Sequence, residues 1–132
     1  MPIVLFCMKK ILVIEDNEEI RENTVELLQL SNFNVRAAVN GRSGFEIAQQ
    51  YLPDLILCDM MMPESDGYFF IQLAKKDKLV KDIPLVFFSA GSPAPDVQQV
   101  LIKLANGYLK KPFTEEDLLQ IITKALNKTK SQ

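Results

Sequence analysis

Residues 54–67 read Asp-Leu-Ile-Leu-Cys-Asp-Met-Met-Met-Pro-Glu-Ser-Asp-Gly, and the fold class follows from this stretch. Leu55–Cys58 is an unbroken apolar run, typical of a strand covered on both faces of a parallel sheet. The run ends in Asp59, and open α/β sheets bind their ligands at the carboxyl ends of such strands. Pro63 and Gly67 then mark a turn before a helical pattern begins. Taken alone, Asp59 is equally consistent with a carboxylate that merely caps the turn.

Strand-like and helix-like segments alternate along the whole chain. Strands are predicted at 10–15, 34–39, 54–59, 84–89 and 107–110. Helices are predicted at 17–30, 43–52, 67–79, 92–106 and from 114 onward. Five strand–helix units with short connections indicate an α/β fold with a doubly wound parallel sheet. We expect one domain at 9–128, with a short extension at 1–8 and a frayed tail at 129–132.

The composition is that of an ordinary globular domain. Of 132 residues, 48% are apolar and 24% are charged, with 15 basic and 17 acidic side chains. Because the formal charge is −2, no basic surface for nucleic acid is indicated, and we expect no direct nucleic-acid partner. The apolar first eight residues are too short for a membrane span, so no membrane partner is expected either.

Cysteine and histidine usage narrows the chemistry. Cys7 and Cys58 make no disulfide framework, which is typical of a reducing, cytoplasmic setting. The chain contains no histidine, so it carries no histidine-based catalysis, histidine metal site or histidine phosphodonor of its own.

Polar side chains stand where four of the predicted strands end, and the topology gathers them at one edge of the sheet. They are Glu15-Asp16, Asp59, Ser89 and Lys110-Lys111. Three carboxylates at that edge would repel one another by a few kcal/mol per close pair, and a hard divalent cation such as Mg²⁺ relieves this. A hydroxyl, an ammonium and a nucleophilic carboxylate would together receive a phosphoryl group. Each residue alone is also consistent with a structural role, as a helix cap, a turn former or a solvated lysine.

Four motifs resemble those of the receiver domain of bacterial two-component response regulators. They are Ile-Glu-Asp-Asn at 14–17, Pro-Asp-Leu-Ile-Leu-Cys-Asp-Met-Met-Met-Pro at 53–63 with Asp66-Gly67, Phe-Phe-Ser-Ala at 87–90, and Gly-Tyr-Leu-Lys-Lys-Pro-Phe at 107–113. The resemblance covers Lys9–Lys128 and implies a flavodoxin-like strand order, 2-1-3-4-5. It implies a phosphoprotein of a phosphorelay, phosphorylated on Asp59 by a sensor histidine kinase or a histidine phosphotransfer protein, with an unknown downstream target. No conventional enzyme activity is expected beyond catalysis of its own phosphorylation and dephosphorylation.

The same resemblance implies a set of metal ligands. Asp16, Asp59 and the backbone carbonyl of Met61 would bind Mg²⁺, or Mn²⁺, directly. Glu15 would act on the ion through water.

The resemblance also implies roles around the phosphoryl group and on the surface. Ser89 would hydrogen-bond the phosphoryl group, and the ammonium of Lys111, the lysine directly before proline, would pair with it. The Lys111-Pro112 peptide bond is commonly cis in the family, which would aim the lysine into the site. Ser89 and Tyr108 match the switch residues, which would reshape the face made by the fourth helix, fifth strand and fifth helix. Ile20 and Asn23 match positions that touch the kinase, and Ile20 as an ordinary core residue is an equal alternative.

Two other functions remain open at this level. One is a phosphorylation-independent pseudo-receiver, although none of the key acidic residues or the lysine is missing. The other is a magnesium-dependent phosphatase with an Asp nucleophile, but such enzymes usually carry a second acid where this chain has Met61. A Rossmann-type nucleotide site is disfavoured because Ile-Glu-Asp-Asn stands where the glycine-rich turn should be.

Overall fold

The structure, a computed structural model, describes residues 8–60, 67–89, 103 and 105–130. Its five strands form one parallel sheet in the order β2-β1-β3-β4-β5, which confirms the predicted fold class and strand order. The strands are β1 (Lys10–Ile14), β2 (Asn34–Ala38), β3 (Leu55–Asp59), β4 (Leu85–Ser89) and β5 (Gly107–Lys110). The helices are α2 (Glu18–Leu30), α3 (Gly41–Tyr51), α4 (Gly67–Lys75) and α6 (Glu115–Lys130). Within the described ranges, no helix is long and apolar enough to cross a membrane.

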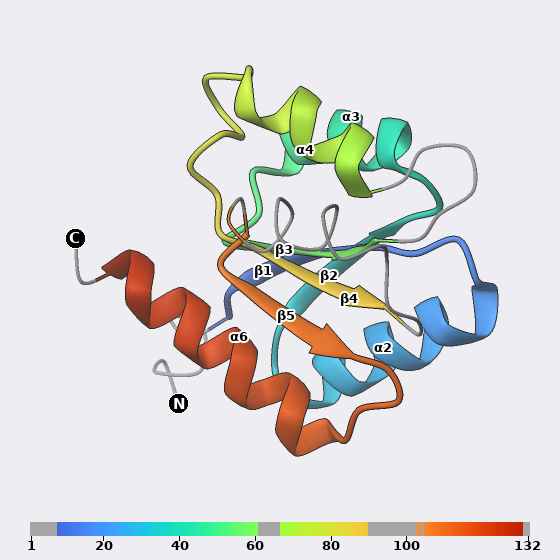
Figure 1. Cartoon of the computed structure of the whole chain (residues 1–132). Helices are drawn as coiled ribbons and strands as arrows, with labels where there is room; N and C mark the ends of the chain where they lie inside the picture. Colours follow the sequence, from blue (N-terminus) through green and yellow to red (C-terminus); the bar gives the residue numbers. More distant parts are fainter. Residues whose placement is uncertain (1–7, 61–66, 90–102, 104, 131–132) are drawn as a thin grey trace.

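Helices cover the sheet on both faces, with α3 and α4 on one side and α2 and α6 on the other (Figure 1). The strands divide their side chains between these layers because successive residues of a strand point to opposite faces. Leu12 and Ile14 of β1 pack in the cluster under α3 and α4, whereas Ile11 and Val13 pack in the cluster under α2 and α6. Every residue of β3 is buried, as its continuous apolar run predicts for a central strand.

Side-chain caps explain where α2 and α3 begin. The Asn17 side chain accepts a hydrogen bond from the Ile20 backbone N–H at 2.9 Å, so α2 starts at Glu18. Asn40 caps α3 in the same way through the Ser43 N–H at 2.8 Å, so α3 begins two residues before the predicted start. The helix ends at Tyr51, and the left-handed Leu52 caps it directly before Pro53.

The prediction that the third helix extends to residue 79 is wrong, because α4 ends at Lys75. Asp77 is the physical reason. Its carboxylate accepts hydrogen bonds from the backbone N–H groups of Leu79 (2.8 Å) and Val80 (3.0 Å) and thereby holds a turn in place of a further helical turn. Most of the helix predicted at 92–106 and most of the extension at 1–8 lie outside the described residues.

Candidate functional site

Strand pairing places Glu15 beside Asp59. The parallel register of β1 and β3 runs from Ile11 opposite Leu55 to Ile14 opposite Cys58, and one further step along both chains reaches Glu15 and Asp59. The Glu15 N–H donates to the Ala38 carbonyl at 3.0 Å and so continues the ladder to β2. By the alternation of each strand, Glu15 and Asp59 lie on the sheet face covered by α2 and α6.

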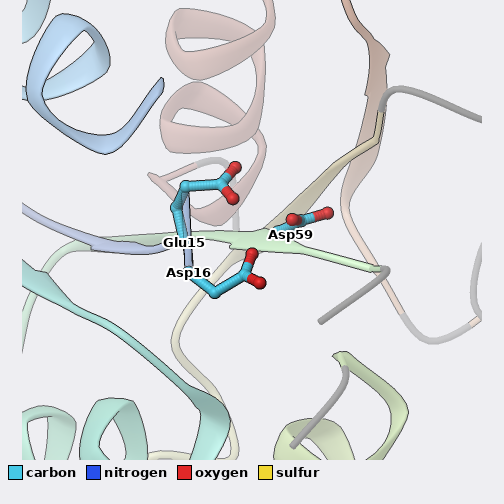
Figure 2. A group of neighbouring side chains, drawn as sticks. All are labelled: Glu15, Asp16 and Asp59. Atoms are coloured by element: carbon cyan, nitrogen blue, oxygen red, sulfur yellow. The ribbon is translucent and has the colours of Figure 1, made fainter. Parts of the chain in front are cut away.

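Three carboxylates meet at this edge of the sheet. One ligand oxygen from each of Glu15, Asp16 and Asp59 lies within 4.8 Å of the other two, and Figure 2 shows the three groups gathered at the ends of β1 and β3. Glu15 and Asp59 are only 1% and 5% exposed, whereas Asp16 is exposed. The cluster therefore has two buried acids and one that opens to solvent.

Lys111 brings a positive charge to this cluster. Its ammonium donates to Glu15 Oε1 at 2.6 Å and lies 3.6 Å from Asp59 Oδ2. The Lys111-Pro112 peptide is cis, as expected from the resemblance. Lys110, the alternative lysine, is exposed at the end of β5. The structure thus brings together Glu15, Asp16, Asp59 and Lys111, four of the residues singled out from the sequence.

Burial dominates the electrostatics of Glu15. Loss of solvent raises the pKa of this carboxyl from 4.5 to about 7, opposed by hydrogen bonds from the Lys111 ammonium and the Asn17 backbone N–H, and reinforced by nearby Asp59. Among the described residues, the Lys111 ammonium therefore lies against two buried acids, and burial holds the pKa of one of them, Glu15, near 7.

The donor set fits a hard divalent cation. Mg²⁺ prefers oxygen ligands and usually takes one or two protein carboxylates while it keeps several waters. Buried Asp59 offers a fixed carboxylate oxygen, and exposed Asp16 stands where water has access. Met61, the predicted backbone ligand, lies outside the described residues, and so does the side chain of Ser89.

An apolar groove of about 730 Å³ lies next to the acidic cluster, between α2 and the segment that links β5 to α6. Its lining residues are Ile20, Asn23, Thr24, Glu26, Leu27, Leu30, Lys111, Pro112 and Phe113. Ile20 is partly buried against the core and also lines this groove, and its contact with a kinase stays a prediction. The sequence singled out Ile20, Asn23 and, on the opposite wall, Lys111, but it gave no role to Phe113, although Phe113 belongs to one of the quoted motifs.

Tyr108, the predicted switch aromatic, lies half-buried on β5. It is the register partner of Phe87 and packs against the core on the α3 and α4 side of the sheet. The switch face also includes the fourth predicted helix, which lies mostly outside the described residues.

The chain is similar to known proteins in sequence and in fold. A sequence model of the response regulator receiver domain matches residues 11–123. The chain is 34% identical to the DNA-binding dual master transcriptional regulator RpaA of Synechocystis over 92% of its own length and 51% of that protein. It is also 34% identical to the phosphate regulon transcriptional regulatory protein PhoB of Klebsiella pneumoniae, over 84% of this chain and 48% of PhoB. The chain thus spans about half the length of these relatives.

A solved structure shows the same fold over nearly the full length of both proteins. The chemotaxis protein CheY4 of Vibrio cholerae superposes with a TM-score of 0.83 at 28% identity, over 90% of this chain and 99% of CheY4.

The comparisons overturn one expectation drawn from composition. The prediction of no direct nucleic-acid partner is wrong, because RpaA, a relative named for DNA binding, matches this chain over 51% of the length of RpaA. The net charge of −2 belongs to 132 residues, and it carries no information about segments that the relatives have beyond the matched half.

Proposed function

Because this chain belongs to the family of response regulator receiver domains, we propose that it is a phosphoacceptor whose Asp59 takes a phosphoryl group from a histidine kinase or a histidine phosphotransfer protein. The observation that carries the proposal is the convergence of three carboxylates within 4.8 Å, with the Lys111 ammonium 3.6 Å from Asp59. We take the domain to span 9–128 and to work in the cytoplasm.

The proposed reaction is a phosphoryl transfer between side chains. A carboxylate oxygen of Asp59 attacks phosphorus, a P–O bond forms, and the P–N bond to the donor histidine breaks while the imidazole leaves and takes up a proton. The product is an acyl phosphate on Asp59. The donor histidine lies outside these 132 residues, which contain none.

Each residue of the cluster has a task in this reaction. Asp16 and Asp59 would hold Mg²⁺ directly, and Glu15 would hold it through water. The ion, when bound, neutralises the charge that develops on the phosphoryl oxygens. Lys111 carries a positive charge to the acceptor, and Ser89 would donate a hydrogen bond to the phosphoryl group.

Intact-mass measurement after incubation with a small phosphodonor tests the acceptor. We expect one added phosphoryl group with Mg²⁺ and none in EDTA. The Asp59→Asn variant should gain none, while Asp82→Asn, which removes an exposed acid outside the cluster, should behave like wild type. Phosphorylation of Asp59→Asn at the wild-type rate would place the acceptor elsewhere.

A phosphorylation-independent pseudo-receiver is not favoured. Such a module has no need for an acceptor, three gathered acids and a lysine, yet all of these residues are present and adjacent.

We propose that the partner which donates the phosphoryl group docks in the apolar groove. Ile20, Asn23 and the 73%-exposed Leu30 line it, and the groove also reaches Lys111. Ile20→Ala, Asn23→Ala and Leu30→Ala should slow transfer from a cognate kinase without slowing small-donor phosphorylation. Leu79→Ala, which removes an equally large, 59%-exposed side chain elsewhere, is the matched control. Equal transfer by all variants would exclude the groove as a docking site.

We further propose that phosphorylation moves Ser89 and Tyr108 and so changes the face around β5. NMR spectra of free and beryllofluoride-Mg²⁺-bound protein should differ at Tyr108 as well as in the acidic pocket. Shifts confined to the pocket would contradict a conformational output.

A further inference from the structure

The ammonium of Lys111 lies over an aromatic ring as well as beside two acids. Its Nζ is 4.5 Å from the ring centroid of Phe88, within the range of a cation–π contact. We propose that Phe88 is a positioning residue, whose ring face holds the Lys111 ammonium at Asp59. This inference rests on the proposed phosphoacceptor function.

The sheet register puts Phe88 where it can act. Phe88 is the direct partner of Asp59 across β3 and β4 and of Leu109 across β4 and β5. Paired residues of adjacent strands project to the same face, so the ring stands next to the acceptor carboxylate. Lys111 follows Leu109 by two residues, and its side chain comes back over this ring.

Neighbouring residues fix the position of the Phe88 ring. Phe113 meets Phe88 edge to face, with 6.1 Å between centroids and 70° between planes. Phe88 is fully buried, and its carbonyl accepts a hydrogen bond from the Met60 N–H at 3.1 Å. A fixed ring face offers a fixed position to a long, flexible lysine side chain, whose rotamer freedom would otherwise spread the charge over several positions.

The position of the Lys111 ammonium matters because Glu15 and Asp59 compete for it. The ammonium lies 2.6 Å from Glu15 but 3.6 Å from Asp59, so Glu15 holds it more closely than the acceptor does. A contact on a third side keeps the lysine within reach of Asp59 when Glu15 is engaged elsewhere. Leucine at position 88 would fill much of the same space without the negative ring face.

Phe87 supplies a matched control, because it is also a fully buried phenylalanine of β4 but packs on the opposite face of the sheet. Phe87→Leu and Phe88→Leu therefore remove equivalent core volume, and only the second removes the face under Lys111. Urea unfolding of both variants gives the folded fraction by which all rates are corrected.

The first readout is the NMR shift of the Lys111 side-chain methylene next to the ammonium, assigned by its loss in Lys111→Arg. A ring face shifts protons above it upfield, so we expect this signal upfield of those of the other lysines in wild type and Phe87→Leu. The signal should return to the common position in Phe88→Leu. An ordinary shift in wild type would refute the contact, whether or not the protein is phosphorylated.

The second readout is the rate of small-donor phosphorylation with Mg²⁺. Phe88→Leu should slow it roughly two- to thirtyfold, the factor that corresponds to a cation–π contact between exposed and desolvated limits. Phe87→Leu should stay close to wild type. Equal rates in the two variants would reduce Phe88 to a packing residue. Failure of wild type to be phosphorylated at all would instead refute the proposed function, while the methylene shift still decides the contact.

Discussion

Replacement of Asp16 by asparagine should stabilise the metal-free protein, although Asp16 is a proposed metal ligand. Its carboxylate lies within 4.8 Å of those of Glu15 and Asp59. Two unit charges 4.8 Å apart repel by about 1 kcal/mol in water and about 3.5 kcal/mol at an effective dielectric of 20. Because Asp16 is exposed, the lower value applies, and two such pairs amount to roughly 2 kcal/mol.

One favourable contribution is lost at the same time. Asp16 stands just before the N-terminus of α2, where a negative charge contributes about 0.3–1 kcal/mol. The net gain for Asp16→Asn is therefore about 1 kcal/mol at pH 8, where Glu15, with its pKa near 7, is ionised.

Urea unfolding in EDTA measures the repulsion that Asp16 adds to the metal-free protein, and urea unfolding in Mg²⁺ measures the stabilisation that the metal provides. Wild type should gain about 1.4 kcal/mol at a Mg²⁺ concentration ten times its Kd, and Asp16→Asn should gain much less. The order of stability is thus expected to reverse when metal is added. Glu22→Gln, which neutralises an exposed acid of α2 outside the cluster, should show no reversal. Lower stability of Asp16→Asn than of wild type in EDTA would refute the repulsion among the three carboxylates, and equal stabilisation of both proteins by Mg²⁺ would refute Asp16 as a metal ligand.

Two further predictions concern stability. The raised pKa of Glu15 means that the folded protein binds an extra proton between pH 4.5 and 7, so its contribution to stability is full below pH 4.5 and is lost as pH rises through about 7. Unfolding free energies in EDTA should show this fall, of at most about 3 kcal/mol, in wild type relative to Glu15→Gln; parallel pH profiles would contradict it. Gly44→Ala should destabilise by roughly 1–2 kcal/mol, because the added Cβ would lie 2.4 Å from Ile14 Cδ1 and the overpacking outweighs the helix propensity gained. Ile14→Val removes that atom and should cost less in the Gly44→Ala background than in wild type; a Gly44→Ala protein more stable than wild type would exclude the clash.

Much of the site was predictable because it follows from local patterns. The apolar run at 55–58 specifies a central strand, and a carboxylate directly after it must lie at the carboxyl edge of a parallel sheet. The helix boundary after residue 75 was missed, since a single aspartate side chain, that of Asp77, competed successfully with a continuing helical pattern.

The sequence alone determined which charged groups reach the edge of the sheet, because strand ends and periodicity are properties of short segments. Tertiary structure decided which of those groups are buried and which residues they contact. Glu15 is buried and Asp16 exposed although they are neighbours, since Glu15 still continues the β1 ladder through its N–H bond to Ala38, whereas Asp16 lies beyond the strand in the turn before α2. The place of Phe88 under Lys111 depends on the register between β3, β4 and β5, which joins residues far apart in the chain. Such pairings depend on how whole strands align when the core closes, and no local pattern at 88 or 111 specifies them.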